Sequence, residues 1–356
     1  MTSEVPNEPA KEHSSHEVSA GMSRRGVFRA AGAGALTLGL AGAASAAARA
    51  ATAATREGPG STSLAPCPPK GFTSRFINAN GLRQHVVIGG DGPPVLLVHG
   101  WPQFWYAWRL VMPALARDFS VIAVDQRGRG LTSKPAPGPS GQGYDTGTLA
   151  NDLAGLMDAL GHQSFSVVGH DTGMDIAYAL AADHPGRVER LAVAEAVLPG
   201  VGTSPPLFLP GPVNEMLFHL MFNRLPTMNV QLVHGREDIF FGFVFDVEAF
   251  RKLPGQAVRV YIDDLADSLA SLSGSFGFYR AWETITAQNQ ERAKTRLTLP
   301  VLAIGGEESA GMAVADAMGL VATNVQTLVI PGCGHFVPDD EAPNELLAAL
   351  IPFLAA

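Results

Sequence analysis

The chain has 356 residues and a formal net charge of −8 at neutral pH. An acidic balance of this kind argues against nucleic acids and other polyanionic partners. Hydrophobic residues make up 46% of the sequence, which is enough to build the core of one large α/β domain with an insertion. The two cysteines, Cys67 and Cys333, are predicted to be free thiols, because a core of this size does not need disulfides.

Residues 1–50 are typical of a bacterial export signal that is removed. A twin-arginine motif at 23–28 (SRRGVF) precedes an Ala- and Gly-rich apolar stretch, and cleavage is expected after Ala46 or Ala48. This stretch is only weakly apolar and soon interrupted, so it does not predict a transmembrane span or a stable membrane anchor. We therefore expect twin-arginine export to a periplasmic or secreted location. A disordered Ala-rich tail is the alternative.

Apolar segments that are typical of strands recur after a linker or arm at 51–71. They lie at 75–77, 85–88, 95–98, 121–124, 165–168, 191–194, 301–304 and 327–330. The first two predict an antiparallel pair separated by Asn80-Gly81. The later runs are almost continuously apolar, as in parallel strands that are covered on both faces. With helical stretches between them, the segments predict an α/β fold with a mostly parallel, eight-stranded sheet.

The alternation of strands and helices breaks at 199–285. This segment begins with several prolines and continues as a helical sequence rich in Phe. It predicts a helical lid inserted after the sixth strand, which divides the core into 72–198 and 286–356. Extra core packing is the alternative for many of these aromatic side chains, and they could also face a second copy in a homodimer.

The segment 169–173 (GHDTG) has the spacing Gly-x-nucleophile-x-Gly. This spacing is typical of a sharp turn between a strand and a helix, and the glycines permit the tight backbone. Asp171 stands at the nucleophile position. A carboxylate attacks amides poorly, but it can open an epoxide or displace a halide to form an ester that water then hydrolyses. An ordinary helix N-cap is the alternative role for this aspartate.

A histidine and a carboxylate in the later sequence complete a candidate catalytic set. His335 follows the last predicted strand in a glycine-rich loop, so it lies at the same sheet edge as the nucleophile and is predicted to activate water. The position after the seventh strand that often carries an acid holds Ser309. Glu195, at the end of the sixth strand, is preferred as the group that orients His335, with Glu307 or Glu308 as alternatives.

Two loops after the third and fourth strands carry further signals. The backbone N–H groups of Trp101 and Thr172 are predicted to form an oxyanion hole, and the side chain of His99 is predicted to be structural. The segment 125–130 (DQRGRG) resembles a phosphate loop but lacks its lysine and glycine register, so a turn is expected. No spacing of His, Cys or Asp indicates a metal site, and no metal or organic cofactor is expected.

Together these motifs resemble those of the epoxide hydrolases of the α/β hydrolase fold. The similarity covers nearly all of 72–356 and includes 101–109 (WPQFWYAWR), the 169–173 turn and the 332–338 loop. It is greater still to the secreted bacterial Cif-type epoxide hydrolases. Those enzymes use a glutamate after the sixth strand and a lid His–Tyr pair that polarises the epoxide oxygen.

The resemblance implies a reaction and a role for lid residues. Glu195 matches the family's glutamate, and His219 and Tyr279 match the pair that holds the epoxide oxygen and donates the proton. The implied activity is hydrolysis of a small epoxide to a vicinal diol through an ester on Asp171. The Phe-rich lid predicts an apolar substrate. Candidate substrate-binding side chains are Trp105, Phe218, Phe222 and Phe278. Without the resemblance, His219 and Tyr279 are expected to be packing residues.

Dehalogenases with the same Asp nucleophile are the main alternative. Haloalkane dehalogenases place Asn two positions after the loop His and Trp directly after the nucleophile, where this chain has Trp101 and Thr172. Fluoroacetate dehalogenases place Arg after the nucleophile to hold the substrate carboxylate, and Thr172 cannot do this. Their lids also use a His and a Tyr. A binding protein without activity is a further alternative, but the intact Asp, Glu and His positions argue against it.

Overall fold

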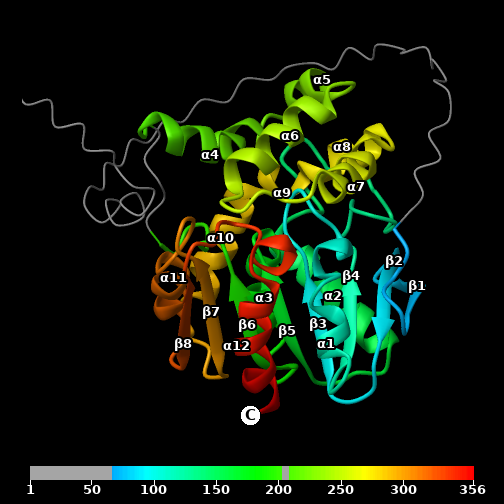
Figure 1. Cartoon of the computed structure of the whole chain (residues 1–356), viewed down its shortest axis with the longest axis vertical. Helices are drawn as coiled ribbons and strands as arrows, with labels where there is room; N and C mark the ends of the chain where they lie inside the picture. Colours follow the sequence, from blue (N-terminus) through cyan, green and yellow to red (C-terminus); the bar gives the residue numbers. More distant parts are fainter. Residues whose placement is uncertain (1–65, 203–207) are drawn as a thin grey trace, which may run out of the picture.

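The fold is known from a computed structural model, which describes residues 66–202 and 208–356. The predicted export segment and most of the arm at 51–71 lie outside the described residues. Figure 1 shows the two parts of the molecule, with a twisted sheet and its flanking helices below and a layer of lid helices above.

The sheet has eight strands in the order β1-β2-β4-β3-β5-β6-β7-β8. The strands are β1 (Phe72–Ala79), β2 (Leu82–Gly89), β3 (Pro94–Val98), β4 (Ser120–Val124), β5 (Phe165–His170), β6 (Val188–Ala194), β7 (Val301–Gly306) and β8 (Val325–Ile330). Strand β2 is antiparallel to β1 and β4, and β3 to β8 run parallel. All eight apolar segments lie within these strands, so the predicted sheet is confirmed.

Helices cover the sheet because its central strands are apolar on both faces. Every residue of β5 and β7 is buried, as expected for parallel strands between two helical layers. The core helices are η3 (Trp105–Trp108), α1 (Met112–Leu115), α2 (Thr146–Ala159), α3 (Thr172–Asp183), α11 (Ala313–Val321) and α12 (Pro343–Ala355), with the short η4 (Val337–Glu341) before α12. Asp145 caps α2 by accepting a hydrogen bond from the Thr148 N–H at 3.0 Å.

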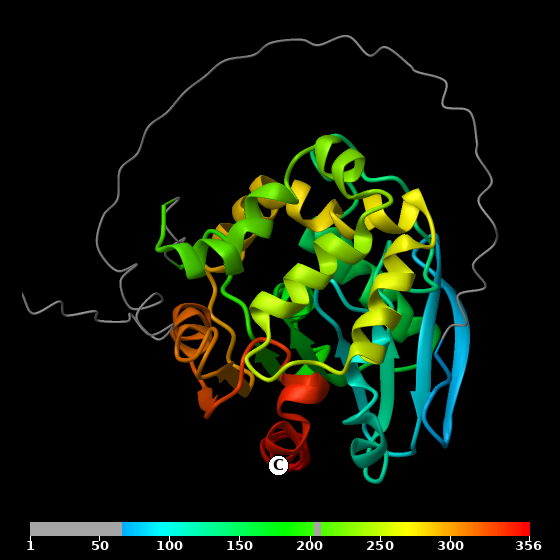
Figure 2. The same cartoon turned by 45° about the horizontal axis from the view of Figure 1, so that its top comes forward.

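The lid helices are inserted between β6 and β7, as predicted. They are α4 (Gly211–Phe222), α5 (Met228–Val233), α6 (Glu237–Glu248), α7 (Gly255–Ala266), α8 (Leu269–Ser275), α9 (Gly277–Arg280) and α10 (Trp282–Arg292). Helix α10 packs on α2 and α3 and so ties the lid to the core. In Figure 2 the green α4 lies toward the orange α11, and the yellow helices lie toward the blue β1 and β2. The lid therefore extends across the whole edge of the sheet. Within the described ranges, no helix has the length and hydropathy needed to cross a membrane.

Candidate active site

Asp171 lies on the sharp turn between β5 and α3. Its backbone has φ 53° and ψ −127°, a conformation that residues other than glycine rarely adopt. The turn is also crowded. A Cβ added to Gly169 would lie 2.3 Å from the Gly173 carbonyl oxygen, and one added to Gly173 would lie 2.3 Å from that of Val98. The glycines therefore let backbone pack on backbone, which raises the Asp171 side chain above the sheet edge.

The two carboxylate oxygens of Asp171 have different surroundings. Oδ1 accepts a hydrogen bond from the Trp101 N–H at 2.7 Å, and the Thr172 N–H also hydrogen-bonds the carboxylate. Oδ2 lies 3.7 Å from Nε2 of His335. Burial raises the pKa of Asp171, while the His335 charge and the two N–H groups act in the opposite direction. One oxygen is thus held at the predicted oxyanion hole, and the other is left for attack.

His335 lies between Asp171 and a second buried carboxylate, Glu195. Nδ1 of His335 is 3.3 Å from Oε2 of Glu195, a loose contact of the kind often seen without substrate. Burial opposes a charge on the imidazole, but the contact with Glu195 and the charges of Glu248 and Asp171 outweigh it and raise the pKa of His335 to about 10. The carboxylates on both sides of the ring therefore favour the imidazolium while Asp171 is ionised.

The backbone around Glu195 explains how a residue after β6 reaches the histidine loop. Glu195 has φ 64°, and its Oε1 accepts a hydrogen bond from the Gly306 N–H at the end of β7. A Cβ on Gly306 would lie 2.3 Å from the Gly334 carbonyl oxygen, so the loop that carries His335 packs directly on this strand end. Of the alternatives, Glu307 accepts a hydrogen bond from the Gly332 N–H at 3.3 Å. The geometry places Glu195 beside Nδ1.

His219 of α4 and Tyr279 of α9 lie over Trp101. The His219 ring stacks on the Trp101 ring with centroids 5.0 Å apart, and the Tyr279 ring meets it edge-on at 5.4 Å. The centroids of His219 and Tyr279 are 5.8 Å apart. Burial lowers the pKa of His219 to about 3 and raises the pKa of Tyr279 well above its usual value. The structure thus brings the predicted pair together, with both side chains neutral.

Residues of the lid and of the sheet edge line a common cavity of about 1010 Å³, including its opening to solvent. Its wall is mainly apolar and contains no Lys or Arg. It is lined by Trp101, Asp171, Thr172, Asp175, Glu195, Ala196, Val197, Leu198, Pro199, Gly202, Met216, Leu217, His219, Leu220, Glu248, Phe278, Tyr279, Trp282, Ser309, Ala310 and His335. The predicted nucleophile, base, orienting acid and lid pair therefore share one cavity.

Of the four side chains predicted to contact substrate, Phe278 lines the cavity. Phe218 and Phe222 do not line it and pack instead against other aromatic side chains of the lid. The centroid of the Phe218 ring lies 5.6 Å from that of Phe240, and the centroid of the Phe222 ring lies 5.1 Å from that of Phe240. Trp105 is buried in η3, where its backbone N–H donates to Oδ1 of Asp125 at 2.9 Å. These three side chains therefore do not line the cavity in this structure.

Two buried carboxyl groups in the cavity were not predicted. Asp175 lies one helical turn after Asp171 on α3, and this i to i+4 spacing is a signal that could have found it. Glu248, the last residue of α6, lies 3.1 Å from Nδ1 of His219. Its sequence context is an aromatic helix without a polar motif, so nothing in the sequence indicates its position.

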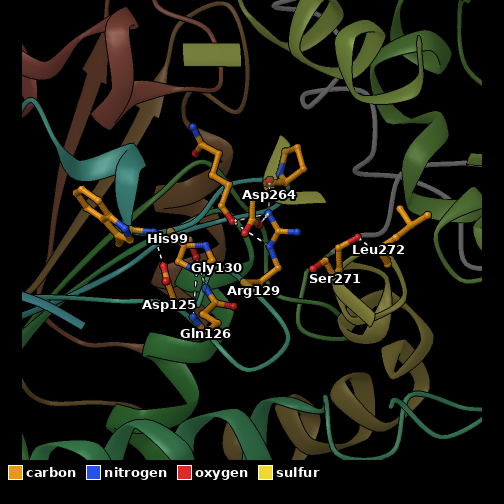
Figure 3. Close-up of polar contacts among 12 residues, drawn as sticks. His99, Asp125, Gln126, Arg129, Gly130, Asp264, Ser271 and Leu272 are labelled. Carbon is orange, nitrogen blue, oxygen red and sulfur yellow. Dashed lines mark hydrogen bonds and ion pairs between the residues drawn. The ribbon is translucent and has the colours of Figure 1, made fainter. Parts of the chain in front are cut away.

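The loop at 125–130 is a structural turn, as predicted. Figure 3 shows Arg129 reaching Asp264 of the lid, with 3.4 Å between the guanidinium and carboxylate atoms. Arg129 also donates to the Gln103 carbonyl oxygen at 3.1 Å. His99 is structural as well, because its Nε2 accepts from the Gln126 N–H at 3.2 Å and burial lowers its pKa to about 4. The loop therefore holds the oxyanion-hole segment against α7.

Within 66–202 and 208–356, no group of three or more His, Cys, Asp or Glu side chains is arranged to bind a metal ion. Cys67 is exposed and Cys333 is buried, and both are free thiols, as predicted.

Comparison with known proteins places this site in a family. Residues 93–342 match the alpha/beta hydrolase fold family. A soluble epoxide hydrolase from Corynebacterium sp. (strain C12) is 34% identical over 283 residues, which is 78% of this chain and 95% of that protein. The solved structure of the epoxide hydrolase CorEH without ligand superposes with a TM-score of 0.72 at 32% identity, covering 80% of this chain and 99% of the other.

A dehalogenase is similar over a shorter segment. The fluoroacetate dehalogenase from a Burkholderia species is 38% identical over 128 residues, which is 36% of this chain and 42% of that protein. The match to the Corynebacterium enzyme extends over most of both chains. The chain therefore belongs to the α/β hydrolase fold family and, within it, to the epoxide hydrolases.

Proposed function

We propose that this enzyme hydrolyses an apolar epoxide to a vicinal diol through an ester on Asp171. The observation that carries the proposal is that the two oxygens of the Asp171 carboxylate have different partners. Oδ1 accepts a hydrogen bond from the Trp101 N–H at 2.7 Å, and Oδ2 faces the cavity and His335. A nucleophile prepared in this way can attack a carbon above it while its other oxygen stays in place.

In the first half-reaction, Oδ2 of Asp171 attacks a ring carbon and the carbon–oxygen bond of the epoxide breaks. The alkoxide that forms needs a proton. His219 and Tyr279 lie together above the nucleophile and are the predicted donors, and their burial keeps them neutral.

In the second half-reaction, water attacks the ester carbon and Oδ1 becomes the oxyanion. Oδ1 already accepts a hydrogen bond from the Trp101 N–H, and the Thr172 N–H hydrogen-bonds the same carboxylate, so these donors are in place before water attacks. Formation of the ester also removes the Asp171 charge, which is one of the charges that raise the pKa of His335. The pKa of His335 therefore falls when the ester forms, and the imidazole becomes a base for water in that state.

The use of Glu195 supports assignment to the secreted Cif-type enzymes. Its carboxylate lies 3.3 Å from Nδ1 of His335, where it fixes the tautomer that leaves Nε2 toward the ester. The twin-arginine segment of the sequence supports export to the periplasm or beyond as part of the same proposal.

Halide displacement is the second candidate, favoured by the partial similarity to a fluoroacetate dehalogenase. A substrate carboxylate is held best by Arg or Lys, and the cavity wall has neither but does contain Glu248 and Asp175. These groups favour a neutral substrate.

The experiment that separates the two reactions uses Glu195→Gln, in which a weakened His335 should let the ester accumulate. The variant is mixed with 1,2-epoxyhexane or with 1-bromohexane, and the intact-protein mass is measured. We expect an adduct with the mass of the whole epoxide and none from the bromide. A hexyl adduct from the bromide alone would replace the proposal with dehalogenation. Asp171→Asn is the control that should remain unmodified with both reagents.

A further inference from the structure

Glu248 occupies a position in the cavity that the proposed reaction has not yet used. It is the last residue of α6, and its side chain is buried among the reacting groups. Its backbone carbonyl accepts a hydrogen bond from the His335 N–H at 3.2 Å. The loop that carries the base therefore fixes the backbone of Glu248, and the carboxyl group is directed to the other side, toward His219.

The contact between Glu248 and His219 involves the nitrogen that does not face the substrate. Oε1 of Glu248 lies 3.1 Å from Nδ1 of His219, yet accepts no well-directed hydrogen bond. The same Nδ1 lies 3.1 Å from the Met216 carbonyl oxygen, which can only accept. If Nδ1–H were the only ring proton, Nε2 would be a bare acceptor, and His219 could not donate to an epoxide oxygen.

The electrostatic surroundings favour a proton on this pair. Burial raises the pKa of Glu248 to about 8, His335 acts in the opposite direction, and the carboxylates of Asp171 and Glu195 add to the rise. The effect of burial is the largest of these, so the carboxyl group is most stable when neutral. The titratable groups that face Glu248 are His219 of α4, Tyr279 of α9, Asp171 after β5, Glu195 after β6 and His335 after β8.

We propose that Glu248 shares a proton with Nδ1 of His219 and thereby keeps a second proton on Nε2, where it can be given to the epoxide oxygen. Glu248 is thus a positioning and proton-supplying residue that acts through His219. This inference rests on the proposed epoxide hydrolysis, and it explains why a neutral imidazole with a pKa of about 3 can act as an acid.

Protons and charge balance over the two half-reactions. When Oδ2 of Asp171 bonds to carbon, the Nε2 proton of His219 moves to the leaving oxygen, and the shared proton remains on Nδ1. The negative charge of Asp171 thereby passes to Glu248, and His219 ends neutral with Nδ1–H toward Met216. The imidazolium of His335 gives its proton to the Glu248 carboxylate, which restores the Glu248–His219 pair and leaves His335 neutral. Water then hydrolyses the ester and gives its proton to His335, which restores the Asp171 carboxylate and the imidazolium.

The test measures ester formation alone, in the Glu195→Gln background in which the ester persists. Glu248→Gln is compared with its parent by the rate at which the intact mass increases, from pH 6 to 10. The reagents are 1,2-epoxypropane and its 1,1,1-trifluoro analogue, which have similar shapes but release alkoxides of very different basicity. Glu237→Gln is the matched control, because it makes the same side-chain change at the opposite end of α6.

We expect Glu248→Gln to slow ester formation from 1,2-epoxypropane by about 100-fold at pH 7, and to slow it much less with the trifluoro analogue, which needs less help from an acid. The parent rate should fall as pH rises through the pKa of Glu248. This decrease should begin somewhat below pH 8, because the background lacks the Glu195 charge, and it should be absent in Glu248→Gln. Glu237→Gln should follow the parent.

Equal losses with both epoxides would show a merely structural role and overturn the inference, as would a parental rate in Glu248→Gln. The proposed function would survive both results, because the parent would still form an ester. If the parent forms no ester with either epoxide, the proposed function fails and the role of Glu248 fails with it.

Discussion

The sheet edge and the lid hold their polar groups in opposite ways. At the sheet edge, Asp171 and Glu195 are carboxylates fixed by unusual backbone conformations and by backbone N–H donors. In the lid, His219, Tyr279 and Glu248 are held by helix packing, and burial shifts the pKa of each toward its neutral form.

This difference divides the work of the proposed reaction. Backbone donors stabilise charge without any reorganisation, so the sheet edge suits the nucleophile and the oxyanion. Burial in an apolar wall without Lys or Arg keeps acids protonated, so the lid suits proton donation. Changes at the sheet edge should therefore stop the reaction or trap the ester, whereas changes in the lid should slow only the formation of the ester.

The largest effect is expected for Asp171→Ser, which removes the nucleophile and leaves no route to the ester. We expect kcat for an apolar epoxide to fall by at least about 10⁴-fold, as for loss of other covalent nucleophiles. Diol formation measures the loss, and circular dichroism checks the fold. Residual turnover above one-hundredth of the wild-type rate would contradict covalent catalysis at this position.

Glu195→Gln should come next, because it removes the acceptor that fixes the tautomer of His335. We expect kcat to fall by about 10²–10⁴-fold, with ester visible by mass spectrometry during turnover. Glu307→Gln tests the alternative acid. Accumulation of ester in Glu307→Gln, with turnover intact in Glu195→Gln, would reverse the assignment.

Tyr279→Phe should slow ester formation by about 10²-fold, because His219 remains as the second donor. Single-turnover kinetics separates the two steps, and hydrolysis of a preformed ester should keep its wild-type rate. A defect confined to ester hydrolysis would break the division between lid and sheet edge.

The smallest effect on activity is expected for Asp264→Asn, at the ion pair of Figure 3 that joins the lid to the loop at 125–130. The change leaves the buried Arg129 without its counter-charge and should lower the free energy of unfolding by about 3 kcal/mol. Thermal unfolding should show a Tm lower by several degrees, with kcat within about twofold of wild type. An unchanged Tm would show that this pair does not stabilise the lid.

The sequence predicts the core better than the lid for a physical reason. Parallel strands between two helical layers need continuous apolar runs, and a sharp turn that carries a nucleophile needs glycines, so the sheet and the position of Asp171 follow from local patterns. Glu195 was predicted as the orienting acid because it stands at the end of the sixth strand. Its positive φ could not be predicted, because no sequence motif indicates it.

The lid carries no comparable pattern. Helix α6 reads EDIFFGFVFDVE and is apolar on several faces, so the sequence does not indicate which face meets the cavity. Glu248 could not be predicted for this reason. The sequence of α4 likewise does not indicate that Met216, Leu217 and Leu220 line the cavity beside His219 whereas Phe218 and Phe222 do not.

The positive φ angles of Asp171 and Glu195 have a consequence for engineering. Each costs stability that a glycine at the same position would recover, on the order of 1 kcal/mol or more. Laboratory evolution that selects only for heat resistance should therefore accumulate glycine or asparagine at 171 and 195. Such a lineage would become more robust while losing its chemistry, so thermostable variants of this enzyme need selection on turnover at every round.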